Sequence, residues 1–285
     1  MSASEQRQKN IGRLQLLAAA LLWGLAGVCV KSITWGPMPI VAVRSFVSLL
    51  MLFAVKRSFK LQINKTNLLG AILLSGTCIL YVIAIKLTTA GTAIVLQYIA
   101  PILVFLYCVL FRHRKATFME VILTFAVFAG CVLSFLDNLD FTHVLGNLLA
   151  LGSGFTFAGQ ILVMNGENCN PQDTTILSNI ICCLIALPFC FTETLSWTRE
   201  NIFWLLIIAI FQFGLANICF SNGIKKVESV EASLLLCLEP IFNPIPVAII
   251  YGEKMGLLAI CGSILVIVSV TLYSVLPHLG KAKQS

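Results

Sequence analysis

The sequence predicts an all-α membrane protein of ten transmembrane helices, built as two inverted five-helix repeats. Hydrophobic residues make up 59% of its 285 residues and charged residues only 11%, against about 25% charged residues in soluble domains. The charges separate apolar stretches of about the length that a bilayer core of roughly 30 Å requires. Segments of the second half of the chain also align with segments of the first. This composition excludes a soluble enzyme, a disordered chain and a nucleic-acid-binding protein.

Ten stretches have the length and hydropathy of membrane helices, and each must be helical because lipid offers its backbone no hydrogen bonds. By residue number they are 14–30, 39–55, 66–85, 87–111, 121–136, 141–166, 174–192, 201–224, 232–252 and 255–276. The first is expected to be a retained helix. Its apolar run exceeds the roughly 7–15 residues of a signal peptide, and Lys31 follows it in place of a small-residue cleavage site.

The basic residues orient the chain. With the N-terminus inside, the inner segments hold 14 Lys and Arg residues and the outer segments hold 4. Because Lys and Arg gather in cytoplasmic loops, we expect a multi-pass protein of the cell membrane with both termini cytoplasmic. The formal charge of +7 is therefore interpreted as a topology signal, and nucleic acid is not expected as a partner.

Internal similarity divides the chain into halves. With a shift of 139 positions, residues 81–102 align with 220–241, and Pro101 meets Pro240. We therefore predict one repeat over residues 1–136, a second over 141–276 and a cytoplasmic tail over 277–285. Since five spans is an odd number, the second repeat enters the membrane from the opposite side, as in many secondary transporters.

A family resemblance rests on the order of several short motifs across the spans. They are Trp23–Gly24, Arg44, residues 98–101 (YIAP), 238–242 (LEPIF), 251–254 (YGEK) and 262–265 (GSIL). In this order the sequence resembles the drug/metabolite transporter superfamily, specifically its EamA-type ten-helix transporters, over about residues 14–273. It departs from the pattern at 112–115, where the family often has an acid before a basic residue, and in the additional prolines Pro244 and Pro246. The resemblance implies a transporter of small metabolites.

Glu239 is the sharpest candidate for a site residue because it is the one acid deep within a predicted span. Ionisable groups in hydrocarbon are costly and mark substrate or ion routes. Pro240 follows it and would break the helix and free backbone carbonyls. Glu239 is also a candidate proton site, since burial favours the neutral form of a carboxyl. The alternative is a structural carboxyl that caps broken backbone or pairs with a basic side chain.

Arg44 is the one basic residue placed within a span. We expect, by a small margin, that its long side chain reaches the outer interface. The alternative is that it faces the bundle, where Arg44 and Glu239 would offer opposite charges to a zwitterion.

Polar and bulky residues at mid-span complete the predicted site. Gln97 and Tyr98 align with Leu236 and Cys237, so helix packing alone does not require polar groups there. Gln160 belongs to a polar stripe on the sixth span, whereas Gln212 and Asn217 are expected on different faces of the eighth. We predict one central cavity lined by Trp23, Tyr81, Gln97, Tyr98, Gln160, Phe220 and Glu239.

These features predict a secondary transporter working by alternating access, with amino acids or related amines, moved outward, as the favoured substrates. Import of carboxylates or cofactors and flipping of sugar-linked lipids are the alternatives within transport. An intramembrane enzyme is the alternative class, but the sequence has no zinc-protease motif, membrane aspartate pair or nucleophile–His arrangement. We expect no cofactor or metal and a monomer in the bilayer, with the eleven cysteines serving as small packing residues.

Overall fold

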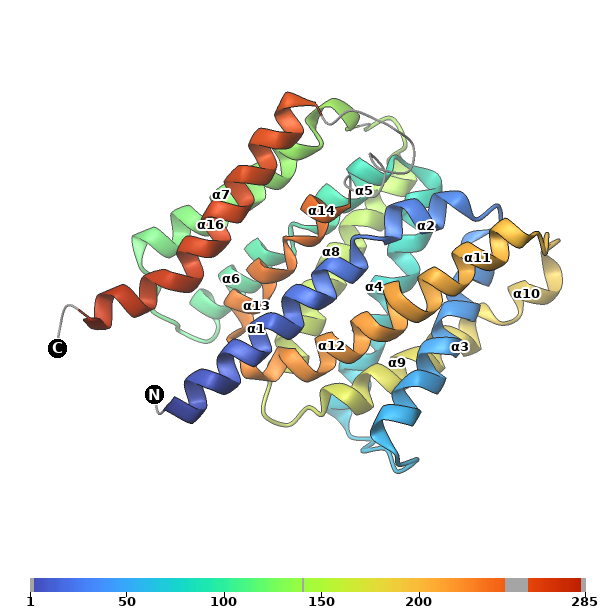
Figure 1. Ribbon diagram of the computed structural model, residues 1–285, viewed down its shortest axis with the longest axis horizontal. Helices are drawn as coiled ribbons and strands as arrows, with labels where there is room; N and C mark the ends of the chain where they lie inside the picture. Colours follow the sequence, from blue (N-terminus) through green and yellow to red (C-terminus); the bar gives the residue numbers. More distant parts are fainter. Residues whose placement is uncertain (1–2, 140, 244–255, 283–285) are drawn as a thin grey trace.

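The computed structural model describes residues 3–139, 141–243 and 256–282, and every regular element in these ranges is helical (Figure 1). The first half contains α1 (Ala3–Trp23), α2 (Ala26–Ser32), α3 (Pro37–Lys56), α4 (Lys65–Leu87), α5 (Ala90–Gln97), α6 (Ala100–Leu110), α7 (Phe118–Ser134) and the short η1 (Leu136–Asn138). The second contains α8 (Val144–Asn165), α9 (Pro171–Ala186), α10 (Phe189–Thr192), α11 (Arg199–Ile207), η2 (Ile208–Leu215), α12 (Ala216–Gly223), η3 (Ile224–Lys226), α13 (Ser229–Leu236), α14 (Glu239–Phe242) and α16 (Leu257–Ala282).

The predicted fold class, an all-helical membrane protein of two repeats, is confirmed. Among the described residues, eight helices or continuous helical runs are long and apolar enough to cross a bilayer, and the shorter apolar helix Phe118–Ser134 accompanies them. The ninth predicted span covers α13 and α14, and its remaining residues, 244–252, lie outside the described ranges. The last helix continues to Ala282, through most of the segment predicted as a tail.

Helix starts follow local capping chemistry. The Asn64 side chain accepts a hydrogen bond from the Asn67 backbone N–H at the start of α4. At the start of α7, Thr117 and Glu120 form a reciprocal capping box. Such caps satisfy backbone N–H groups that the first helical turn leaves without partners. Both caps lie in loops expected on the cytoplasmic side.

The two repeats are broken at equivalent points. The bounds of α5, shifted by 139 residues, are the bounds of α13, and the first residue of α6 shifts onto the first residue of α14. Pro101 and Pro240 lie at the starts of the second segments. Because proline has no backbone N–H and crowds the carbonyl four residues earlier, each repeat has a helix break just before its proline.

The helices interlock across the two halves. Within the bundle α4 packs along α8, α3 along α9, and α1 along α12, while α7 and α16 lie side by side at one edge (Figure 1). At that edge a Cβ added at Gly130 would lie 2.7 Å from Cγ2 of Val266 and 2.9 Å from the Gly262 carbonyl oxygen. Small residues allow this close approach, which drives helix association where lipid provides no hydrophobic contrast.

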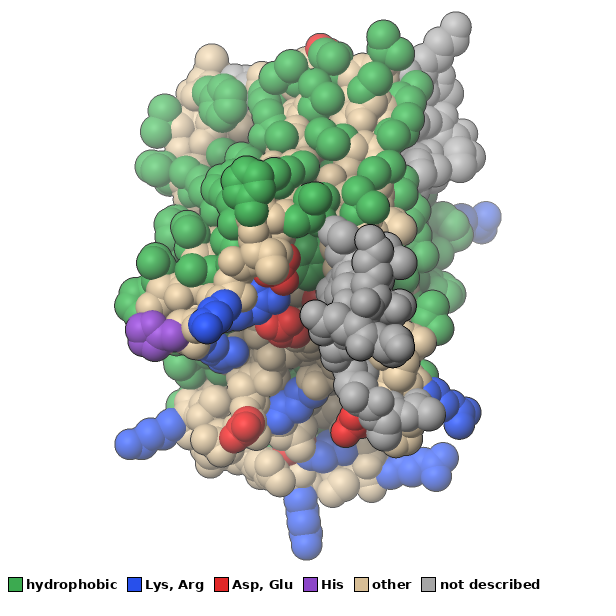
Figure 2. Space-filling model, turned by 90° about the vertical axis from the view of Figure 1, so that its left-hand side faces the viewer, with side chains coloured by type: hydrophobic (Ala, Val, Ile, Leu, Met, Phe, Trp, Pro, Cys, Tyr) green, Lys and Arg blue, Asp and Glu red, His purple; other side chains and the backbone are tan. Residues whose placement is uncertain are grey.

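The surface separates apolar from charged regions. Figure 2 shows hydrophobic side chains covering the upper part of one face, with Lys and Arg side chains gathered below them. The first residues of α1 and the last of α16 lie at the same end of the bundle (Figure 1). A lipid-facing apolar surface explains why many large hydrophobic side chains are exposed, since in a soluble protein they would form an unusually large patch.

Candidate functional site

A small pocket lies in the middle of the bundle, between the two halves of the chain. Its volume is about 50 Å³, room for roughly four water molecules. Seven lining residues come from the first half and six from the second. They are Trp23, Arg44, Leu74, Thr77, Cys78, Tyr81, Gln97, Phe157, Gln160, Gln212, Phe213, Asn217 and Glu239.

Glu239 reaches the pocket because it opens α14 directly after the helix break. Its side chain is buried, with 5% of the residue exposed. The Tyr98 hydroxyl oxygen lies 2.6 Å from Oε2 of Glu239 and 2.9 Å from the carbonyl oxygen of Leu236. Leu236 is four residues before Pro240, so its carbonyl is the one that the proline leaves without a helical partner. Tyr98 therefore connects the break in the first repeat to the break in the second.

Arg44 also faces the pocket, and the expectation that it reaches the outer interface is wrong. Only 3% of the residue is exposed. Its guanidinium carbon lies 4.3 Å from the centre of the Phe213 ring, and Nη2 donates to the Cys78 carbonyl oxygen at 3.3 Å. The α3 helix packs against α9 and η2, which turns this face of α3 inward and holds the side chain over an aromatic ring.

A π-helical segment brings two amides to the pocket. Gln212 and Asn217 are five residues apart, a spacing that a regular α-helix places on different faces. Gln212 lies within η2, which runs as a π-helix from Ile208 to Leu215, and Asn217 follows in the first turn of α12. The hydrogen bonds of a π-helix join residues five apart. Both side chains therefore line the pocket, which corrects the expectation that they lie on separate faces.

Several buried oxygens at the pocket have no hydrogen-bond donor. They are Oε1 of Gln160, Oε1 of Gln212 and Oδ1 of Asn217. Buried polar atoms are nearly always paired, so orphaned acceptors around a cavity indicate a place where a donor-bearing solute or water binds. Together with the Glu239 carboxylate, they make the pocket rich in acceptors.

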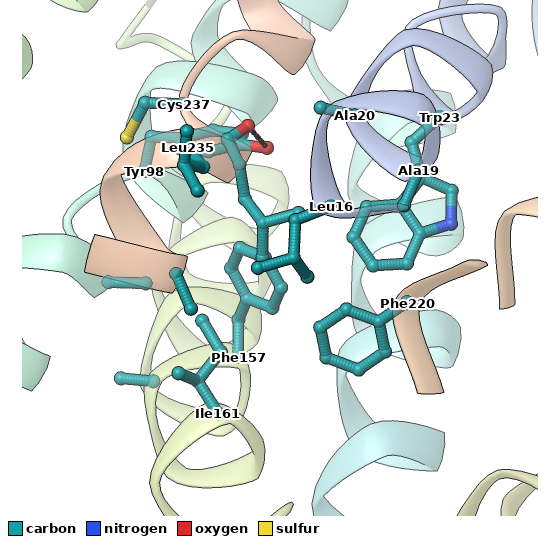
Figure 3. Close-up of a cluster of buried hydrophobic side chains, with 14 of the residues drawn as sticks. Leu16, Ala19, Ala20, Trp23, Tyr98, Phe157, Ile161, Phe220, Leu235 and Cys237 are labelled. Atoms are coloured by element: carbon teal, nitrogen blue, oxygen red, sulfur yellow. Dashed lines mark hydrogen bonds between the residues drawn. The ribbon is translucent and has the colours of Figure 1, made fainter. Parts of the chain in front are cut away.

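Aromatic rings form one wall and the packing behind it. The Trp23 ring centre lies 5.2 Å from that of Phe220 and 6.3 Å from that of Phe157, and the Tyr98 ring lies 5.9 Å from Phe157. Figure 3 shows Trp23 and Phe220 facing each other, with Phe157 between them and Tyr98. Trp23 and Phe157 line the pocket, whereas Phe220 supports Trp23 from behind.

The predicted residues are brought together, although in different roles. Trp23, Tyr81, Gln97, Gln160 and Glu239 line the pocket. Tyr98 and Phe220 are buried one layer behind the pocket, where Tyr98 contacts Glu239 and Phe220 contacts Trp23. That these residues bind substrate stays a prediction.

Sequence reasoning missed the aromatic residues Phe157 and Phe213 and the α4 residues Leu74, Thr77 and Cys78. The Thr77 hydroxyl pairs with that of Thr156 at 2.9 Å, a contact between distant segments that the sequence does not reveal. An aromatic ring in an apolar helix carries no sequence signal for the direction it faces.

At one end of the pocket the halves are joined by ion pairs. Glu231, in the first turn of α13, lies 2.5 Å from Arg13 and 2.7 Å from Lys9. Glu228 lies 2.6 Å from Arg114. A further pair joins Lys56 and Asp173. All these residues belong to segments that the charge bias assigns to one side of the membrane.

At the opposite end the halves are joined by neutral contacts. Nε1 of Trp35 donates to the Ser196 carbonyl oxygen at 2.9 Å, and the Trp35 and Trp197 rings are 4.7 Å apart. Asn201 accepts from the Thr34 backbone N–H at 3.1 Å. Along the chain Arg13, Trp23 and Trp35 follow in order through α1, α2 and the next loop, so the pocket lies between these two sets of contacts.

Neither a metal cluster nor a disulfide is found in the described ranges. No three His, Cys, Asp or Glu side chains there converge as metal ligands. The eleven cysteines are free thiols, and seven of them are buried. What the site offers to a solute is thus its carboxylate, its guanidinium, its amides and its rings.

Comparison with known proteins places the chain among transporters. The model of the EamA-like transporter family matches residues 10–136 and 144–275. A protein of Bacillus subtilis (strain 168), named as an uncharacterized transporter, YwfM, is 26% identical over 294 residues, covering 97% of this chain and 98% of that protein. A crystal structure of another protein covers 93% of this chain and 96% of its own, with a TM-score of 0.81 and 17% identity. At that identity the likeness shows the fold alone.

Proposed function

Because the chain belongs to the EamA-like transporter family and is thus a membrane transporter of small solutes, we propose that its central pocket binds amino acids or related amines. The pocket would be exposed to the two sides of the membrane in turn. Of the two function classes expected from the sequence, family membership supports the transporter over the intramembrane enzyme.

The excess of buried acceptors carries the proposal. An ammonium group has three N–H donors and no acceptor, and it would meet the Glu239 carboxylate and the orphaned oxygens of Gln160, Gln212 and Asn217. The faces of Trp23 and Phe157 attract cations through their ring quadrupoles. A carboxylate has no donor for these acceptors, and a neutral sugar could donate hydroxyls to the amide oxygens but would give the Glu239 carboxylate no counter-charge.

The hydrogen-bond geometry around Tyr98 supports proton exchange at Glu239. The Tyr98 hydroxyl has one hydrogen but two acceptors within reach, the Leu236 carbonyl and the Glu239 carboxyl. Each contact has a hydrogen of its own if Glu239 carries a proton and donates it to the Tyr98 oxygen, while Tyr98 donates to Leu236; with an ionised Glu239 the two acceptors would share the single Tyr98 hydrogen. An ammonium and a proton would then compete for one carboxylate, which couples outward substrate movement to inward proton movement.

The closed ends of the pocket support alternating access. The ion pairs of Glu231 and Glu228 at one end, and the Trp35 contacts at the other, all join the first half to the second. The cavity of about 50 Å³ is smaller than most amino acids require, so substrate binding requires the two halves to move apart. Opening either end requires one of these two sets of contacts to separate.

Topology and assembly are part of the same proposal. We propose a cell-membrane protein with cytoplasmic termini and the repeats over residues 1–136 and 141–276, working as a monomer. Supporting this, Arg13, Lys56, Arg114 and Lys226 make their contacts between the halves at the end of the bundle where α1 begins.

The test is counterflow in proteoliposomes with labelled leucine, alanine and 3-methylbutylamine, for the wild type, Glu239→Gln and the matched control Glu167→Gln. Glu167 is an exposed carboxyl outside the pocket. We expect flux of at least one probe in the wild type and the control, and none in Glu239→Gln at unchanged thermal stability. Equal flux in all three proteins would contradict the assignment of Glu239, and flux of none of the probes by the wild type would contradict the substrate class.

A further inference from the structure

A buried guanidinium without a carboxylate partner is the least explained feature of the pocket. Five ion pairs are formed within the described ranges, and Arg44 takes part in none of them. Its contacts are the Phe213 ring and a 3.3 Å bond to the Cys78 carbonyl, and its Nε has no partner. A guanidinium presents five N–H donors, so most of its hydrogen-bonding capacity is unused.

Such a group is costly where it lies. A buried charge is stable when it is paired and fully hydrogen-bonded, and ionisable side chains at membrane depth mark functional positions by default. None of the ion pairs of the described residues gives Arg44 a carboxylate partner, although its side chain lines the pocket. A carboxylate that enters the pocket would supply that partner.

We propose that Arg44 binds the carboxylate of the substrate, which makes the substrate a zwitterionic amino acid and excludes a simple amine. This inference rests on the proposed function. The ammonium would face Glu239, and the carboxylate would accept paired N–H bonds from the guanidinium fork. Arg44, Tyr81 and Glu239 line the same small pocket, so both charged groups border the space that a solute would occupy.

The placement of the two charges also connects binding to closure. Arg44 belongs to α3 in the first half, and Glu239 belongs to α14 in the second. A zwitterion held at both ends bridges the halves across the pocket, whereas a singly charged analogue holds only one of them. A bound amino acid would therefore hold the two halves together around it.

The experiment uses three probes with one hydrocarbon skeleton. Leucine carries both charges, 3-methylbutylamine lacks the carboxylate, and 4-methylpentanoate lacks the ammonium. Displacement of labelled leucine from the purified full-length protein gives the affinity of each. We expect leucine to bind the wild type about ten- to a hundredfold more tightly than either analogue, the range of one charge-assisted contact.

The variants separate recognition from folding. In Arg44→Gln, the affinity for leucine is expected to fall to the affinity for 3-methylbutylamine. The affinity for 3-methylbutylamine itself, measured by calorimetry, is expected to stay unchanged. Arg44→Lys is expected to be intermediate, because lysine keeps the charge without the planar fork. The control is Arg112→Gln, an exposed arginine outside the pocket, with thermal stability measured for every variant.

Two results would overturn the inference. One is wild-type protein that binds 3-methylbutylamine as tightly as leucine, a result that needs no variant. The other is a folded Arg44→Gln protein that keeps its preference for leucine or loses the amine as well. Both would leave amine transport intact, whereas binding of none of the three probes by the wild type would contradict the proposed function itself.

Discussion

Two glutamates three residues apart at the start of α13 differ sharply in burial, and their substitution should have different consequences. The Glu231 side chain is 4% exposed and contacts both Arg13 and Lys9, while the Glu228 side chain is 51% exposed and contacts Arg114. Breaking a buried ion pair typically costs about 3–5 kcal/mol. Arg13 and Lys9 keep 16% and 21% of their side chains exposed, so for Glu231→Gln we expect the lower end, about 3 kcal/mol. For Glu228→Gln we expect less than about 1 kcal/mol, as for exposed pairs.

The assay is thermal unfolding of both variants in the same detergent, together with the double variant of Arg13→Gln and Glu231→Gln. Because membrane proteins often unfold irreversibly, the ranking of midpoints is used in place of absolute free energies. The drop in unfolding midpoint of the double variant should be smaller than the sum of the drops of the two single variants, since Arg13 and Glu231 share one interaction. Equal destabilisation by Glu228→Gln and Glu231→Gln, or strict additivity in the cycle, would refute the reasoning.

Three further outcomes follow from the same geometry. Gly130→Ala should destabilise the protein by about 1–3 kcal/mol through overpacking and lower its unfolding midpoint, because the added Cβ would lie 2.7 Å from Val266. Gly152→Ala is the control and should leave the midpoint unchanged, because its Cβ would make an ordinary 3.5 Å contact. Tyr98→Phe should lower the free energy of unfolding by about 1–3 kcal/mol, because the buried Leu236 carbonyl loses its donor. The variant should still release a proton when substrate binds, which a pH titration of the substrate-bound protein would show. A cysteine at Lys226 should be labelled by an impermeant maleimide in inverted vesicles and not in intact cells, and the reverse pattern would invert the topology.

The sequence predicted those features of the fold that have local causes. Charge spacing located the spans, and Pro240 indicated a break in the second repeat, because a proline acts on its own helix. Glu239 was identified for the same reason, as an acid in an apolar stretch needs no tertiary information to stand out. The equivalent break before Pro101 was not predicted, although the two prolines were aligned. The length of the last helix was not predictable, since residues after 276 are less apolar and their helicity depends on continuation from α16.

The direction of side chains was harder to predict. Arg44 lies in a mostly apolar helix, so the sequence alone does not show that its face packs on α9 and η2. Gln212 and Asn217 were assigned to different faces on the assumption of a regular α-helix, but the π-helical segment that contains Gln212 brings both side chains to the pocket. Phe157 and Phe213 look like any lipid-facing or core aromatic. Such residues become identifiable only when the helices are assembled around the pocket.

The central claim is that the substrate ammonium and a proton compete for the Glu239 carboxylate. The most direct test is to measure proton release when substrate binds. Leucine is added to purified protein in weakly buffered detergent solution, and the released protons are counted against the leucine bound. If ammonium and proton compete for Glu239, the wild type should release up to one proton per leucine and bind more weakly as the pH falls, because protonation removes the carboxylate. Glu239→Gln should release none, with weak binding that no longer depends on pH. Leucine binding without proton release in the wild type, or equal release in Glu239→Gln, would contradict the mechanism.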